Sequence, residues 1–182
     1  MNYLEELAYW YFRFNGYFLI NNFVNHKDNI DLDHTYETDF LGIRLPNVFE
    51  AIGGNNNDYD ENITSESKIM CVMGESKSGR FHVDKIFKSK EVIKNNILRF
   101  GLLPSNDITE EIVEHLYINN SWENEKIKIF KVLVAENEVQ NKKYIYISKN
   151  TIIDDFTRRK NIYRKNKDKI HFGSNLAQYL FS

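Results

Sequence analysis

The chain has 182 residues, which suits one domain with a sizeable core. Hydrophobic residues make up 42% of the chain and aromatic residues 14%, so we expect a packed globular protein rather than a disordered one. The formal net charge of −2 excludes a generally basic nucleic-acid coat, although local basic patches can still bind phosphate. The single cysteine, Cys71, excludes disulfide bonds and a cysteine-rich zinc module.

The sequence also bears on targeting and on metal type. The N-terminal segment MNYLEELAYW has two acidic residues and no basic start, so no signal peptide is expected. No apolar stretch approaches the roughly 20 residues that span a bilayer. We therefore predict a cytoplasmic protein with no membrane association. The histidines show neither HxH nor HExxH spacing, which argues against a zinc enzyme.

The first half of the chain reads as one helix followed by three strands. Its first apolar side chains recur at helical spacing, and Gly16 follows as a residue that typically ends a helix. Two runs rich in aromatic and β-branched residues and one continuous apolar run come next, separated by polar segments. We predict a helix over 2–15, strands over 17–24, 37–45 and 69–76, and a long exposed loop over 53–67.

The second half alternates helices with strands. A helix over 89–101 is followed by one that continues through Tyr117, for which Asp107 and Glu110 form a capping box. Alternating apolar residues then indicate two strands. The remaining elements expected are strands over 126–135 and 142–148, a helix around 151–166 and a shorter helix from about Ser174.

This order of elements predicts the architecture. Three consecutive strands fit an antiparallel meander, and the helical crossover before the fourth strand allows a parallel pairing. No internal repeat or interdomain linker is visible. We therefore predict a single α/β domain, with a mixed sheet of about five strands flanked by helices.

The third predicted strand ends in a group of residues that can carry chemistry. The segment KIMCVMGESKSGRF is apolar until Gly74, and side chains two apart in a strand share a face, so Glu75 and Lys77 lie together. Asp39, near the start of the preceding strand, can converge with Glu75. Two carboxylates and the backbone carbonyl of Ser76 make a hard-oxygen site of the kind that Mg²⁺ prefers. A lysine beside it can orient or deprotonate water, or stabilise charge on a phosphate.

Context separates this tripeptide from a second copy in the same chain. Glu66-Ser67-Lys68 has the same acid-x-lysine spacing but lies in the polar segment before the strand. Only the copy at Glu75 follows an apolar run and has an upstream aspartate at the head of another strand.

The stretch TDFLGIRLP, followed by KIMCVMGESKSG, resembles the PD-(D/E)xK nuclease superfamily, which has the restriction-endonuclease-like fold. Asp39 matches the first acid, Glu75 the second acid and Lys77 the lysine, while Thr38 stands where the motif's name has proline. The resemblance implies an α-βββ-α-β core and Mg²⁺- or Mn²⁺-dependent cleavage of nucleic acid, most often DNA. Some members add a carboxylate from the leading helix, for which Glu6 is the candidate. A homodimer is also a possible assembly, since cutting both strands of a duplex needs two active sites.

A basic run near the C-terminus is the candidate nucleic-acid contact. RRKNIYRKNKDK, over 158–169, holds seven basic residues against one acid. It is either a solvated helix face or a phosphate-binding patch, and both interpretations stay open. The residues proposed to bind nucleic acid are Arg158, Arg159, Lys160, Arg164 and Lys165.

Other interpretations of the chain also stay open. The acids and the lysine can be a polar strand edge with a surface ion pair. The protein can be a catalytically inactive module that keeps the nuclease fold and binds nucleic acid or another protein. It can also be a partner-binding subunit that uses Tyr9 and Phe12 on the other face of the first helix.

Overall fold

The computed structural model describes residues 2–25, 36–49, 59–103, 106–137 and 141–162, together with residues 176, 178 and 179. Two sequence predictions fall wholly or mostly outside these ranges. They are the helix from about Ser174 and the nucleic-acid contacts of Arg164 and Lys165.

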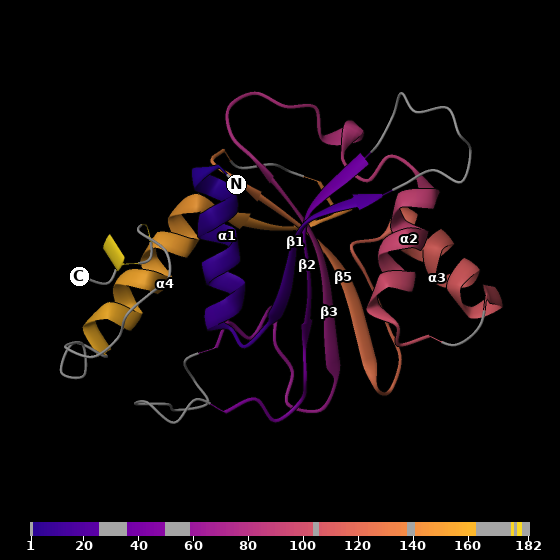
Figure 1. Cartoon of the computed structure of the whole chain (residues 1–182), viewed down its shortest axis with the longest axis horizontal. Helices are drawn as coiled ribbons and strands as arrows, with labels where there is room; N and C mark the ends of the chain where they lie inside the picture. The colour runs from indigo at the N-terminus through magenta and orange to yellow at the C-terminus, as the bar shows by residue number, and fades with distance from the viewer. Residues whose placement is uncertain are drawn as a thin grey trace.

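Strands form one mixed sheet between two layers of helices (Figure 1). This confirms the predicted α/β class. The helices α1 (Tyr3–Phe14) and α4 (Lys149–Ile162) cover one face, while α2 (Lys90–Phe100) and α3 (Asn106–Ile118) cover the other. The strands are β1 (Phe18–Asn25), β2 (Tyr36–Arg44), β3 (Ile69–Lys77), β4 (Ser121–Glu123), β5 (Ile127–Ala135) and β6 (Ile145–Ser148).

The strand order follows the prediction from the sequence. β1, β2 and β3 pair antiparallel as a meander, and β5 pairs parallel with β3 after the crossover through α2 and α3. β6 pairs parallel with the second half of β5, and the short β4 pairs antiparallel with its first half. β4 was not predicted, because three residues are too few to show an alternating pattern.

The parallel strands give the sheet two distinct ends. β3, β5 and β6 all finish at the same end, here called the upper end, which is uppermost in Figure 1. The antiparallel β2 begins at the upper end and finishes at the opposite one, the lower end. α1 runs from the upper end toward the lower end, so its N-terminal turn lies near the ends of the parallel strands.

Local capping explains where the helices begin and end. Asn2 caps α1 by accepting from the backbone N–H groups of Leu4 and Glu5, and the Glu5 side chain accepts from the Asn2 backbone. After α1, Gly16 adopts a φ of 85°, a conformation that glycine takes without strain. The capping box proposed for α3 is wrong, because the helix already begins at Asn106 and Asp107 lies inside it.

The core has one cluster on each face of the sheet. Side chains of α1, α4 and the inward residues of β3 and β5 form the first, and α2 and α3 pack on the second. Cys71, inside the apolar run that predicts the strand over 69–76, belongs to the second cluster and is fully buried. Phe12 is also fully buried, so the interface proposed for Tyr9 and Phe12 is wrong for Phe12. The fully buried Ile63 likewise corrects the idea that 53–67 is exposed throughout.

One further boundary differs from the prediction. The last strand begins at Ile145 rather than residue 142, because residues 142 and 143 form a turn. Among the described ranges, no helix has the length and apolar character needed to cross a membrane.

Candidate active site

The acids and the lysine predicted from the sequence meet at the upper end of the sheet, where β2 and β3 separate. The last paired residues of these strands are Phe40 and Gly74. Asp39 and Glu75 are therefore the first residues beyond the ladder on neighbouring strands. Gly74 is required here, because a Cβ at this position would lie 1.9 Å from the Phe40 ring. The Phe40 ring thus packs over the backbone just before the reactive residues.

Direct contacts tie the three side chains together. Lys77 Nζ lies 2.6 Å from Glu75 Oε2 and 3.4 Å from Asp39 Oδ2. The backbone N–H of Ser76 donates to the same Asp39 oxygen at 2.6 Å. The N–H and C=O of one residue in an extended strand point to the same neighbour, so the Ser76 carbonyl is also directed to the Asp39 side.

Burial makes Glu75 the most constrained member of the cluster. The residue is 1% exposed, and among the described residues its Oε1 has no hydrogen-bond partner. Burial, followed by the charge of Asp39, raises the pKa of Glu75 to about 7, although Lys77 acts in the opposite direction. A buried carboxylate oxygen is costly unless it is paired, so Glu75 can accept a cation or a donor such as the nearby Tyr36 hydroxyl.

For Asp39 and Lys77, burial and the neighbouring groups shift the pKa in opposite directions. Burial raises the pKa of Asp39, while the Ser76 N–H and Lys77 counteract it. Burial alone would lower the pKa of Lys77, but Glu75 and Asp39 outweigh it and the pKa is raised. Lys77 is therefore a stable cation between two carboxylates. With both carboxylates ionised, the cluster keeps one net negative charge, which favours a further cation.

The donor set fits a hard divalent cation that keeps several water ligands. Within the described part of the chain, no three His, Cys, Asp or Glu side chains are grouped so that they could hold a metal. The cluster instead offers Asp39, the unpartnered Glu75 Oε1 and the Ser76 carbonyl. Mg²⁺ is commonly held by one or two carboxylates together with water and phosphate oxygens, so this smaller set suffices.

The carboxylate predicted from the leading helix has a different candidate in the structure. Glu5, in the first turn of α1, is the helix residue whose charge acts on Asp39 and raises its pKa. Glu5 also belongs to the capping box of α1. The role predicted for Glu6 stays a prediction, and Glu5 is added as an alternative.

A cavity opens beside the cluster on the α2–α3 side. It has a volume of about 310 Å³, and its lining includes Glu75, Lys77, Tyr36 and the exposed Glu37. The rest of its wall comes from the segment after β3, through Phe81, His82, Lys85 and Ile86. A larger cavity of about 480 Å³ lies at the lower end around Arg44. Of these two cavities, the smaller one is lined by Glu75 and Lys77, so it is the candidate substrate cavity and is called the substrate cavity below.

Two tyrosines that the sequence did not single out hold the wall of this cavity. The Tyr36 hydroxyl accepts from the Phe87 N–H at 3.2 Å, and the Tyr144 hydroxyl donates to the Ile86 carbonyl at 2.6 Å. Tyr36 also lies beside Glu75 and favours its ionised form. Phe87 has a φ of 44°, which is strained for a bulky residue. Sequence spacing gives no signal for such long-range anchors.

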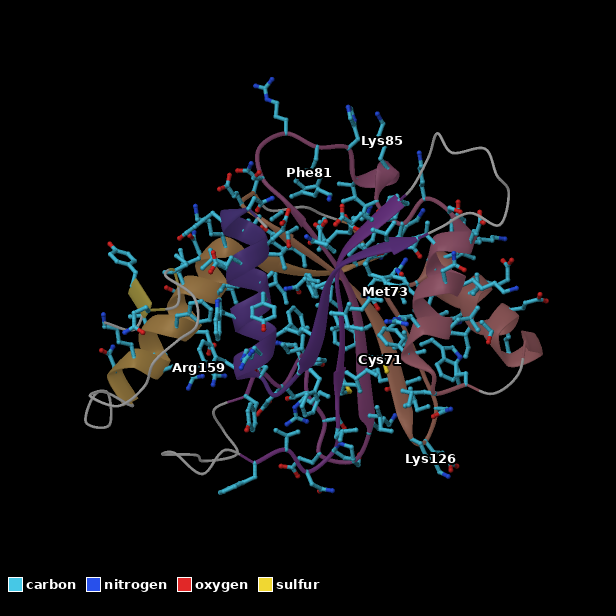
Figure 2. The ribbon with its side chains drawn as sticks, viewed as in Figure 1. Cys71, Met73, Phe81, Lys85, Lys126 and Arg159 are labelled. Atoms are coloured by element: carbon cyan, nitrogen blue, oxygen red, sulfur yellow. The ribbon has the colours of Figure 1, made fainter. Side chains whose placement is uncertain are left out.

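The basic residues predicted to bind nucleic acid are not beside the cluster. Arg159 is 1% exposed, donates to Asp155 at 2.8 Å and lies over the Phe14 ring at the end of α1. It is held inside the protein, so its prediction as a phosphate contact is wrong. Arg158 also pairs with Asp155, at 2.7 Å. Phe14 is nine residues from Glu5, or about 13 Å along the helix, and Figure 2 shows Arg159 well away from Phe81 and Lys85 at the upper end of the sheet.

Thr38, which stands where the motif has proline, has a structural role. Its buried hydroxyl bonds with the side chains of Asn25 on β1 and Asn96 on α2. It therefore fastens α2 to the sheet next to Asp39.

Comparisons with protein-family models, with curated proteins and with solved structures find no match for this chain. Its function must therefore be argued from its own geometry.

Proposed function

We propose that this protein is a metal-dependent nuclease that hydrolyses phosphodiester bonds, with Asp39, Glu75 and Lys77 as its active site. One observation carries the proposal: Lys77 lies within 3.4 Å of both acids, while Glu75 Oε1 is buried and lacks a partner among the described residues. A surface ion pair at a strand edge would leave both carboxylates hydrated, and neither an orphaned oxygen nor an adjoining cavity would be expected.

The strand arrangement supports the finer fold assignment, which we also propose. A leading helix, an antiparallel three-strand meander and a crossover to a parallel strand are what the restriction-endonuclease-like resemblance implies. The reactive residues then lie on the second and third strands, as the PD-(D/E)xK motif requires. Nucleic acid as the substrate, DNA as its usual form, and a homodimer remain predictions from that resemblance.

Each side chain has a defined task in the proposed reaction. Asp39, Glu75 and the Ser76 carbonyl would hold Mg²⁺ or Mn²⁺, which polarises the phosphate and acidifies water. The Lys77 ammonium, held by both acids, orients the attacking water and stabilises charge that develops on the phosphate. Water attacks phosphorus and one P–O bond breaks, which leaves a phosphate monoester and a hydroxyl. The Glu75 carboxylate must be ionised for this task, and Lys77 favours that form.

The test is cleavage of plasmid and single-stranded DNA and of RNA by the purified chain, with Mg²⁺, Mn²⁺ or EDTA. We expect cleavage only with a divalent cation. Asp39→Asn and Lys77→Met should each slow it by about 10²- to 10⁴-fold, the range that positioned acid–base groups contribute. The matched control is Lys68→Met, from the second acid-x-lysine copy, which pairs with Glu123 away from the cluster.

The outcomes separate the nuclease from its rivals. Equal cleavage by wild type and Lys77→Met would contradict the proposed site. Absence of cleavage with all substrates, combined with salt-sensitive retention on nucleic acid, would favour the inactive binding module. A thermal shift with Mg²⁺ in wild type but not in Asp39→Asn would still identify the metal site in that case.

A further inference from the structure

The segment between β3 and α2, residues 78–88, forms the outer wall of the substrate cavity and is here called the β3–α2 loop. Its sequence, SGRFHVDKIFK, contains three Lys or Arg residues and one acid. Arg80, His82, Lys85 and Lys88 are all exposed. Figure 2 shows Phe81 and Lys85 at the upper end of the sheet, far from Lys126 at the lower end and from Arg159.

The cationic side chains of this loop are not held in ion pairs with the described carboxylates, unlike many others in the described part of the chain. Among the described side chains, no carboxylate lies within 4.0 Å of Arg80, Lys85 or Lys88. By contrast, both described arginines of α4 are paired with Asp155. Unpaired surface cations near a phosphodiester-cleaving site can bind phosphates and release counterions.

Two cavities adjoin in this loop, and the aromatic side chain of Phe81 lines both of them. Phe81 and His82 line the substrate cavity of about 310 Å³ and a second cavity of about 450 Å³. The second cavity is further lined by Arg80 and Asn137. Arg80 and the pair Glu75 and Lys77 therefore line two cavities that have Phe81 in common.

Phe81 is held firmly enough to act as a platform. It is half-buried and packs against the core cluster on the α2–α3 face. Tyr36 and Tyr144 fasten the following residues, Ile86 and Phe87, and so fix the C-terminal part of the loop against the sheet. An aromatic side chain between cations is the pattern of single-strand binding, in which bases stack and phosphates meet positive charge.

We propose that the β3–α2 loop binds a single strand of nucleic acid and guides it to the active site. The phosphates lie on Arg80, Lys85 and Lys88, and a base stacks on Phe81. The inference rests on the proposed function for the choice of nucleic acid as ligand. It assigns binding to a part of the chain other than the basic run of α4.

The experiment measures binding separately from cleavage. A fluorescent oligothymidylate of about 16 nucleotides is titrated with the full chain in EDTA, and its anisotropy is followed at several salt concentrations. Arg80→Ala/Lys85→Ala should bind about tenfold more weakly at 0.15 M salt. Its slope of log K against log salt should be about 1.4 smaller, since each phosphate contact on a single strand contributes about 0.7.

Matched variants test the location and the stacking. Lys68→Ala/Lys126→Ala also removes two charges, both from the lower end, and should bind within about twofold of wild type. Phe81→Leu keeps an apolar side chain and should weaken binding about fivefold or more, while Phe81→Trp should retain it. Melting temperatures of all variants verify that the fold is kept.

Each result decides the inference independently of the nuclease assay. Unchanged binding by Arg80→Ala/Lys85→Ala overturns it, even if the protein cleaves DNA. No binding by wild type overturns it as well. Equal affinity for a duplex of the same length, with no effect of Phe81→Leu, overturns the single-strand assignment. Loop-dependent binding without cleavage upholds the inference and contradicts the nuclease.

Discussion

The two ends of the sheet treat buried charge in opposite ways. At the lower end, the buried Arg44 donates to the carbonyls of Asn15 at 2.9 Å and Ser65 at 2.7 Å, and it lies over the Tyr59 ring. At the upper end, the equally buried Glu75 has one oxygen on Lys77 and another without a partner among the described residues.

This difference distinguishes a buried charge that stabilises the fold, Arg44, from one that belongs to the candidate active site, Glu75. The guanidinium of Arg44 joins the end of α1 to the segment before β3, and the two backbone carbonyls accept hydrogen bonds from it. The carboxylates at the upper end are held close together at a cost in stability. Unfavourable arrangements of this kind persist where function requires them, and they cluster at active sites. The following predictions test the contrast by stability.

The largest stability effect is expected at the lower end. Arg44→Met removes charge-assisted hydrogen bonds to the buried Asn15 carbonyl and the partly buried Ser65 carbonyl, at roughly 2 kcal/mol each, so we expect a loss of about 4 kcal/mol in the free energy of unfolding. Urea denaturation measures it, and Arg44→Lys should lose less because it keeps a charged donor. A loss below about 1 kcal/mol for Arg44→Met would contradict the supporting role.

Gly74 marks the boundary between the packed part of β3 and the reactive part. Gly74→Ala would place a Cβ 1.9 Å from the Phe40 ring, so the fully packed ring must move. We expect a loss of about 3 kcal/mol from overpacking. The double variant Phe40→Leu/Gly74→Ala should be more stable than the sum of the single changes, as double-mutant analysis of unfolding will detect. Strict additivity would argue against this contact.

Lys131 is a buried cation between the two ends, and it gives a pH-dependent prediction. Burial and then Lys143 lower its pKa from 10.5 to about 8, while its ammonium lies 5.0 Å from the Tyr144 ring centroid. Between pH 8 and 10.5 the unfolded chain keeps a proton that the native protein has lost, so stability rises with pH. The lowered pKa corresponds to roughly 3 kcal/mol, and we expect Lys131→Met to gain about 2 kcal/mol at pH 7 after loss of the Tyr144 contact.

Unfolding measured across this pH range checks the sign. The advantage of Lys131→Met over wild type should shrink by pH 10, when wild type holds the lysine neutral. A constant difference from pH 7 to 10 would mean that packing rather than charge is responsible.

The smallest effect is expected at the upper end, with a sign opposite to that of Arg44. Glu75→Gln removes a buried charge, while Lys77 keeps its ion pair with Asp39. We therefore expect a gain of about 1 kcal/mol in the free energy of unfolding in metal-free buffer. The same variant should lose cleavage. Thermal melts in EDTA measure the stability change. A clear destabilisation would mean that Glu75 supports the fold, and the contrast between the two ends would fail.

Periodic patterns carried most of the fold prediction. The strand over 69–76 and the helix over 89–101 were found within one residue of β3 and α2, because each buries a continuous or regularly spaced apolar face. β4 and the start of α3 were missed or misplaced. Their identity depends on pairing and packing with distant residues rather than on local spacing.

The basic residues show the same limit on the functional side. Charge density in the sequence singled out the run that contains Arg159, yet the fold buries Arg159 against Asp155. Of the more dispersed cations of the β3–α2 loop, Lys85 lines the substrate cavity and Arg80 lines the neighbouring cavity. The sequence shows how many charged residues a segment has, whereas burial and ion pairing in the fold decide which of them a ligand can reach.

The sequence by itself determined the order of the described helices and strands other than β4, the antiparallel meander and the candidate triad of Asp39, Glu75 and Lys77. Side-chain alternation and apolar runs are local, so they can be read without the fold. Only the tertiary structure decided that the two acids meet on one lysine, that Oε1 of Glu75 is buried without a hydrogen bond among the described residues, and that Tyr36 and Tyr144 fasten the loop above them. Those features arise from contacts between residues far apart in the chain, which no local pattern encodes.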